Sequence, residues 1–262
     1  MRERSGLRAE SEALVVVEDL AKSYGGVRAV DGVSFAIPRG SLTGMIGPNG
    51  AGKSTVLGMI AGAIRPDRGS IVLEDRQIAG LPSHQVARLG VIRTFQTASV
   101  FPRMTVLENL LLGVPPWWGE RIVPALFARS RWRAQERDQV HRARRLLDRL
   151  GLSFMADSYA AQLSGGQKRL VEIGRAMMAR PKLLLLDEPM AGVSRTLAPV
   201  IEDLVAELRQ EGMTVLLIEH ELALVERLCS PVVVLAQGRV LHRGEMADAR
   251  ANPEVRRAYL VG

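Results

Sequence analysis

Cysteine, lysine and long apolar runs are all scarce in this chain of 262 residues. The single cysteine, Cys229, cannot form an internal disulfide, and no Cys/His cluster has metal-ligand spacing. The longest segment without Asp, Glu, Lys or Arg has 13 residues, whereas a membrane-spanning helix needs about 18 or more apolar ones. Residues 1–13 contain neither a readable secretory signal nor a lipid anchor, so we expect a flexible tail there. These absences favour a protein of the cytoplasm.

Positive charge is in excess, and the excess is local. The net charge is +7, and residues 121–149 hold nine arginines against three acidic residues. Such a segment is typical of a surface that meets nucleic acid, anionic headgroups or an acidic partner, and equally of a solvated helical face. Trp117 and Trp118, just before it, indicate either a contact surface or local core packing.

Apolar runs that predict strands alternate with helical patterns along most of the chain. The strands are predicted at residues 14–17, 42–46, 71–73, 91–95, 183–186, 214–218 and 232–235. Apolar residues at helical spacing from Leu197 to Leu208, followed by Gly212, predict an amphipathic helix. This alternation predicts an α/β fold, in which functional groups gather at the carboxyl ends of the strands.

Strand signals vanish between about residues 101 and 162. Thr105 and Glu108 have the spacing of a capping box at the start of the helical run VLENLLL. An arginine-rich helix is predicted over roughly residues 133–150. We therefore expect a helical insertion in the α/β fold.

A glycine-rich loop follows the second predicted strand directly. It reads GPNGAGKST and consists of Gly47, Pro48, Asn49, Gly50, Ala51, Gly52, Lys53, Ser54 and Thr55. Backbone N–H groups of such a loop, the start of the next helix and the Lys53 ammonium together cradle a polyphosphate, and the Ser54 hydroxyl can bind magnesium. A plain strand-to-helix turn is the weaker alternative.

Two carboxylates stand at the end of the apolar run LLLLDEP. A bound metal explains adjacent carboxylates at the end of a buried strand better than packing does, so we predict that Asp187 holds magnesium through water. Glu188 would lie on the other side of an extended backbone and accept a proton from an attacking water. The alternative is an exposed acidic turn.

The segment LSGGQ predicts a second phosphate-binding helix start, with the helix beginning near Lys168. Ser164 and Gln167 have capping-box spacing around Gly165 and Gly166, which leaves backbone N–H groups for an anion. With this motif the sequence resembles the ABC ATPase family. The phosphate loop, RTFQ, LSGGQ, LLLLDEP and a late IEH triplet occur in that family's order, and the resemblance covers roughly residues 14–261.

The resemblance implies a P-loop (RecA-like) ATPase core with an N-terminal antiparallel β subdomain and a helical insertion subdomain. Residues 14–262 would form one domain, with the core and β subdomain in 14–96 and 168–262 and the helical and signature subdomain in 97–167. It also implies that Tyr24 stacks on adenine, that Gln96 contacts magnesium and senses the γ-phosphate, and that His220 hydrogen-bonds that phosphate. LSGGQ would act on ATP held by a partner subunit. Ser194 stands where the family usually has aspartate, which is a departure.

Several segments look like the ATP-binding subunits of bacterial importers for branched-chain amino acids. They are GGVRAVDGVSF, IRTFQ, FPRMTVLENLLLG, LLIEHELALVERLC and NPEVRRAYLVG. The resemblance implies a second ATPase chain, two transmembrane permease subunits and, indirectly, a periplasmic substrate-binding protein, at the cytoplasmic face of the membrane. Urea and short-chain amide importers share most of the pattern. A nucleic-acid-linked ATPase is the remaining alternative, although no aromatic and basic interleaving for stacking bases is visible.

Overall fold

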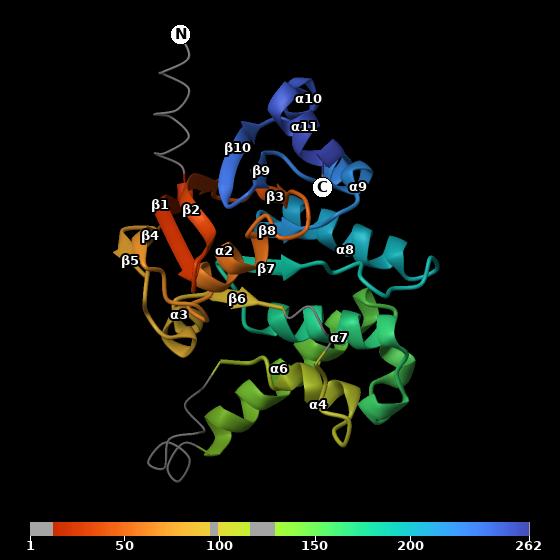
Figure 1. Cartoon of the computed structure of the whole chain (residues 1–262). Helices are drawn as coiled ribbons and strands as arrows, with labels where there is room; N and C mark the ends of the chain where they lie inside the picture. Colours follow the sequence, from red (N-terminus) through yellow and green to blue (C-terminus); the bar gives the residue numbers. More distant parts are fainter. Residues whose placement is uncertain (1–12, 95–98, 116–128, 262) are drawn as a thin grey trace. The chain divides into compact units, whose positions relative to one another are not determined.

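The computed structural model describes residues 13–94, 99–115 and 129–261 of the chain (Figure 1). Its residues group into two compact units, which we describe separately. The core unit comprises the described residues of 1–93, 182–190 and 205–262. The helical unit comprises those of 94–181 and 191–204. No helix in the described ranges is long and apolar enough to cross a membrane.

The core unit contains a six-stranded sheet in the order β10-β9-β3-β8-β7-β6. Its strands are β3 (Leu42–Ile46), β6 (Val91–Arg93), β7 (Leu183–Asp187), β8 (Thr214–Ile218), β9 (Val232–Ala236) and β10 (Arg239–Gly244). All pairs are parallel except β9 with β10. Every residue of β3, β7, β8 and β9 is buried, as expected for parallel strands covered on both faces. The carboxyl ends of β3, β8 and β7 therefore lie side by side at one edge of the sheet.

A second, antiparallel sheet has the order β2-β1-β4-β5. Its strands are β1 (Ala13–Tyr24), β2 (Val27–Pro38), β4 (Arg68–Leu73) and β5 (Arg76–Gln77). β1 is far longer than the predicted strand at 14–17. The pairing of β1 shifts register between Val17 and Leu20, where Asp19 has a φ of 47°. The prediction depended on the apolar run LVVV, which ends before Glu18, whereas the strand continues past the irregularity to Tyr24.

Short helices complete the core unit. They are α2 (Lys53–Ile60), α3 (Ser83–Arg88), α9 (Leu222–Leu228), α10 (Met246–Ala251) and α11 (Pro253–Val261). The predicted amphipathic helix is α8 (Ala198–Gln210), whose residues belong to both units. Its apolar stripe is buried at Ile201, Leu204, Val205 and Leu208, and Gly212 follows with a φ of 77°. The prediction of this helix is confirmed.

The helical unit contains no strand among its described residues, as predicted. Its helices are α4 (Val106–Leu111), α6 (Arg129–Arg149), η2 (Ser153–Met155), η3 (Ala160–Gln162) and α7 (Gly165–Met178). The capping box at the start of α4 is present: Glu108 N–H donates to the Thr105 hydroxyl at 3.1 Å, and Thr105 N–H donates to the Glu108 carboxylate at 2.7 Å.

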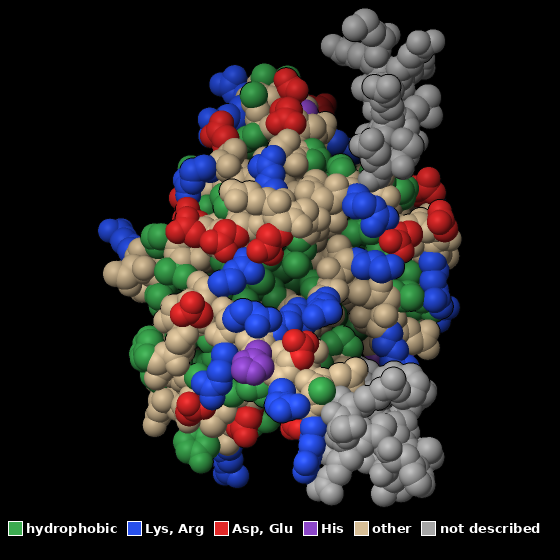
Figure 2. All heavy atoms as spheres, turned by 180° about the vertical axis from the view of Figure 1, so that it is seen from behind, with side chains coloured by type: hydrophobic (Ala, Val, Ile, Leu, Met, Phe, Trp, Pro, Cys, Tyr) green, Lys and Arg blue, Asp and Glu red, His purple; other side chains and the backbone are tan. Residues whose placement is uncertain are grey.

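The arginine-rich segment forms α6, and its arginines have different surroundings. Arg142 donates to the carbonyl oxygens of Met177 and Met178, at 2.8 and 3.0 Å, and so binds the C-terminal turn of α7. The exposed ones are Arg133, Arg137, Arg144, Arg145 and Arg149. Basic and acidic side chains are interspersed over the face of the molecule in Figure 2. Arg142 thus joins α6 to α7, and the exposed Arg144 pairs with Asp157 at 3.2 Å.

Candidate functional site

The glycine-rich loop joins β3 to α2 and leaves the start of α2 without a side-chain cap. Gly52 is the N-cap residue, with a φ of 98°. A Cβ atom at Gly52 would lie 2.4 Å from the carbonyl oxygen of Ala29, and one at Gly47 would lie 2.1 Å from that of Leu235. Glycine is required at both positions because the neighbouring backbone approaches so closely. The uncapped helix start offers backbone N–H groups and the positive end of the helix dipole to an anion.

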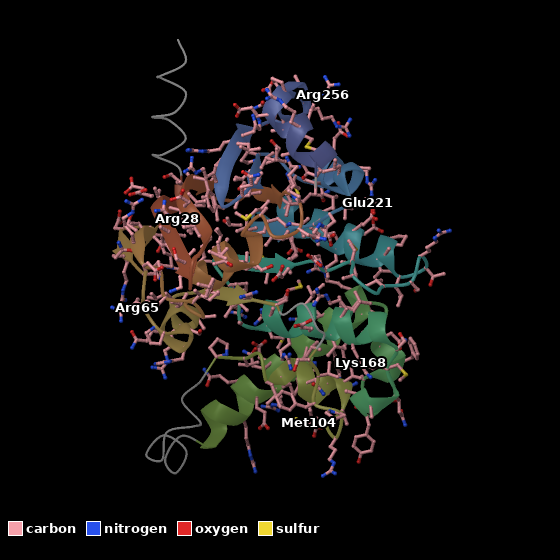
Figure 3. The ribbon with its side chains drawn as sticks, in the orientation of Figure 1. Arg28, Arg65, Met104, Lys168, Glu221 and Arg256 are labelled. Atoms are coloured by element: carbon pink, nitrogen blue, oxygen red, sulfur yellow. The ribbon has the colours of Figure 1, made fainter. Side chains whose placement is uncertain are left out.

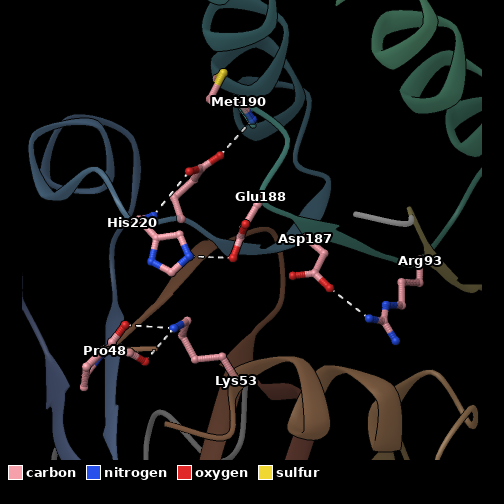
Figure 4. Close-up of polar contacts among 9 residues, drawn as sticks. Pro48, Lys53, Arg93, Asp187, Glu188, Met190 and His220 are labelled. Atoms are coloured by element: carbon pink, nitrogen blue, oxygen red, sulfur yellow. Dashed lines mark hydrogen bonds and ion pairs between the residues drawn. The ribbon is translucent and has the colours of Figure 1, made fainter. Parts of the chain in front are cut away.

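Lys53 lies at the first position of α2 with its ammonium turned back over the loop (Figure 4). Its Nζ donates to the carbonyl oxygens of Gly47 at 2.8 Å and Pro48 at 3.0 Å. Burial lowers the pKa of Lys53, and the nearby charges of Glu188 and Asp187 oppose that shift. The charge of Lys53 is therefore held inside the loop and close to both carboxylates.

β7 and β8 are neighbouring parallel strands in which Asp187 pairs with Ile218. The Glu188 N–H still donates to the Ile218 carbonyl oxygen at 3.0 Å, but its φ is 48°. The prediction of an extended backbone at Glu188 is therefore wrong. The chain turns there into the left-handed region, although a following proline favours an extended residue, and such strained residues cluster at functional sites.

The turn at Glu188 brings its side chain to His220, which follows β8. His220 Nε2 and Glu188 Oε1 are 2.5 Å apart (Figure 4). The Glu188 side chain is 16% exposed and that of His220 44%, so the pair lies at an opening to solvent. Two residues predicted as catalytic, 32 positions apart in the sequence, are thus in direct contact.

Asp187 is buried at the end of β7 and forms an ion pair with Arg93. Arg93 is the last residue of the neighbouring strand β6, and its Nη2 lies 2.8 Å from Asp187 Oδ2. The buried Asp187 carboxylate and the exposed Ser54 hydroxyl both offer oxygen ligands, which Mg²⁺ prefers. Arg93 was not predicted as a site residue: it lies in the middle of the strand predicted at 91–95, whereas β6 ends at Arg93.

Glu219, between β8 and His220, is a second functional candidate that the sequence analysis missed. It is only 5% exposed, and its carboxylate accepts hydrogen bonds from Met190 N–H at 2.9 Å and His220 N–H at 3.3 Å. Burial raises the pKa of Glu219, whereas the two N–H donors act in the opposite direction. A charged residue following directly on the apolar run TVLLI was the only signal in the sequence.

Tyr24 and Gln96 are two further residues of the predicted site. Tyr24, at the end of β1, is 49% exposed, and Lys22 Nζ lies 5.6 Å from the centroid of its ring. Gln96, Trp117 and Trp118 lie outside the described residues.

LSGGQ lies in the helical unit, at the start of α7. The helix begins at Gly165 rather than near Lys168, because Ser164 is its N-cap. Ser164 and Gln167 form a capping box: Gln167 N–H donates to the Ser164 hydroxyl at 3.3 Å, and Ser164 N–H donates to the Gln167 side chain at 2.9 Å. Ser194 forms a hydroxyl–hydroxyl hydrogen bond with Thr196 at 2.9 Å.

A glycine-rich loop after a buried strand, with an acidic pair and a histidine at the ends of neighbouring parallel strands, defines a phosphate-loop nucleotide-binding protein. Residues 30–191 match the family model described as ABC transporter. This chain belongs to that family, and it is an ATP-hydrolysing enzyme.

Similar proteins extend the likeness to nearly the whole chain. The branched-chain amino acid transport ATP-binding protein BraF of Pseudomonas aeruginosa is 40% identical over 95% of this chain and 98% of its own. The probable branched-chain amino acid transport ATP-binding protein LivG of Archaeoglobus fulgidus is 39% identical over 94% and 95%. A solved ATP-binding cassette of an ABC transporter in its ADP conformation has a TM-score of 0.80 at 38% identity, covering 95% of this chain and 98% of that one.

Proposed function

We propose that this chain is the ATP-binding and ATP-hydrolysing subunit of an importer for branched-chain amino acids. The observation that carries the proposal is the contact of Glu188 with His220 beside a phosphate loop. The cargo is proposed from the named relatives, which are about 40% identical over nearly their full length. Because the ATPase subunit does not itself hold the cargo, a urea or short-chain amide importer is the second candidate.

Each polar group of the site has a proposed role. Lys53 and the N–H groups at the start of α2 bind the phosphates of ATP, and Tyr24 receives the adenine ring. Glu188 accepts the proton of the attacking water, and His220 holds Glu188 in place or hydrogen-bonds the γ-phosphate. Asp187, Ser54 and Gln96 would hold Mg²⁺, which when bound neutralises charge on the phosphates.

The assembly is proposed on the same basis. A second ATPase chain, identical or different, would bring its LSGGQ segment to the ATP held by this one, since one phosphate loop supplies only part of the charge stabilisation that phosphoryl transfer needs. Two permease subunits would hold the pair at the cytoplasmic face of the membrane, and a periplasmic binding protein would deliver the cargo. No nucleic acid is expected as a partner.

Glu188→Gln tests the chemistry. We expect kcat for ATP hydrolysis to fall by about 100-fold or more, because the amide cannot accept the proton, while ATP affinity stays within about twofold. The matched control is Glu221→Gln, the same change in an exposed side chain at the start of α9, and it should hydrolyse ATP normally (Figure 3). Normal turnover by Glu188→Gln would refute the assigned role.

The same variant tests the cargo in the native cell. Uptake of labelled leucine should require Glu188 and should be inhibited by unlabelled valine but not by urea. Leucine uptake that is indifferent to Glu188→Gln would leave the ATPase in place and move the cargo to urea or amides. Binding of labelled DNA or RNA that weakens steeply with salt would instead favour the nucleic-acid alternative.

A further inference from the structure

The catalytic groups proposed above are held by a ring of contacts that closes through Glu219. Glu188 continues through Pro189 to Met190, whose N–H donates to Glu219 at 2.9 Å. The other carboxylate oxygen of Glu219 accepts from His220 N–H at 3.3 Å, and the His220 ring returns to Glu188 at 2.5 Å. Figure 4 shows this ring, with the carboxylate between Met190 and His220 joined to both by dashed lines.

The ring joins two segments that only the sheet brings together. Glu188 and Met190 follow β7, whereas Glu219 and His220 follow β8, and the last residues of these strands, Asp187 and Ile218, are paired. One step further along, the Glu188 N–H donates to the Ile218 carbonyl oxygen, so the strand pairing reaches the start of both segments. Glu219 bonds both of them at backbone N–H groups, which have fixed positions.

Burial makes the two hydrogen bonds of Glu219 consequential. With only 5% of Glu219 exposed, water has little access to replace a lost donor. A carboxylate suits this position because it offers two acceptor oxygens, one for each N–H. A carboxamide offers one acceptor only, and its nitrogen would face an N–H donor.

We propose that Glu219 is a positioning residue for ATP hydrolysis: it fixes the distance between Glu188 and His220 by bonding the backbone on both sides of the pair. It acts through these two residues and touches no reacting atom. The proposal rests on the roles assigned above to Glu188 and His220. It predicts an effect on the hydrolytic step with none on nucleotide binding, because the contacts of Lys53 with the phosphate loop do not involve Glu219.

Glu219→Gln tests the proposal in two backgrounds. In the otherwise unchanged full chain, we expect kcat to fall about 10- to 100-fold with ATP affinity within about twofold, as for a misplaced catalytic group. In the His220→Ala background, the same change should lower the residual single-turnover rate by less than about threefold, because the pair that Glu219 positions is already broken. Glu221→Gln is the matched control and should change neither rate.

A purely structural role predicts a different pattern. An equal loss in both backgrounds, or a folded Glu219→Gln protein with a kcat within about twofold of wild type, would overturn the proposal. Glu219→Asp keeps both acceptor oxygens and should retain several times more activity than Glu219→Gln. If Glu219→Gln does not fold, Glu219→Asp is measured in its place, in both the wild-type and the His220→Ala backgrounds. A normal rate for Glu188→Gln would instead refute the proposed catalytic assignment itself, so the two failures are distinguishable.

Discussion

Two helices of this protein begin with a glycine-rich segment, and their starts are built differently. At α2 the N-cap is Gly52 in the left-handed region, with no side-chain cap. At α7 the N-cap is Ser164, and a capping box satisfies Gln167 N–H and Ser164 N–H within the chain. The start of α2 is thus open to an anion by itself, whereas part of the donor set at α7 is already used. This contrast fits the roles proposed for the two segments, in which the start of α2 is the primary phosphate site.

The largest expected effect separates the two helix starts by charge. Lys53→Ala should weaken ATP binding by about 100-fold, because a buried ammonium directed into the phosphate loop is lost. Lys168→Ala, in the first turn of α7, is the matched control and should leave ATP affinity of the monomeric chain unchanged (Figure 3). Titration with a fluorescent ATP analogue measures both. Equal losses would remove the distinction between the two sites.

A smaller effect separates the two starts by backbone geometry. Gly52→Ala should lower the free energy of unfolding by about 2 kcal/mol, because its Cβ would lie 2.4 Å from the Ala29 oxygen at a φ of 98°. A Cβ at Gly165 meets no atom within 4 Å, so Gly165→Ala should leave stability unchanged or slightly raised. Urea unfolding of both variants measures this. A stable Gly52→Ala protein with normal ATP binding would contradict the required close approach.

The smallest effect concerns the side-chain cap, which α7 has and α2 lacks. Ser164→Ala should destabilise the protein by about 1 kcal/mol, since Gln167 N–H loses its acceptor, whereas Ser164→Gly should cost only a few tenths. Thermal unfolding of the three proteins, followed by circular dichroism, gives the comparison. An unchanged melting temperature for Ser164→Ala would mean that the capping box contributes no stability at α7.

Short-range features were the most predictable from the sequence. The strands at 42–46 and 214–218 have the predicted bounds, because a fully buried strand reads as an unbroken apolar run. The capping boxes at Thr105 and Ser164 were also predicted, since each joins residues only three positions apart. β10 was not predicted: it is an edge strand with arginine and histidine among its six residues, and so lacks a continuous apolar pattern.

For the site, the sequence predicted which residues are present better than how they are arranged. The glycine loop and the acidic residues after β7 were identified from their own segments. The left-handed turn at Glu188 was missed, because an apolar run at 183–186 predicts only the strand and an extended backbone was expected to continue beyond it. Glu219 and Arg93 were missed for a further reason: each has a partner at least 29 positions away, Met190 and Asp187 respectively, which no local pattern specifies.

The sequence by itself therefore determined the parts of this protein: a phosphate loop between a strand and a helix, a capped helix start at LSGGQ, and polar residues where apolar runs end. Only the tertiary structure decided which of these parts meet. β7 and β8 pair in parallel, so the residues that follow them become neighbours although Glu188 and His220 are 32 positions apart. The physical reason is that local hydrogen bonds need only the segment that makes them, whereas contacts such as Glu188 with His220 need the whole buried sheet to align both strand ends.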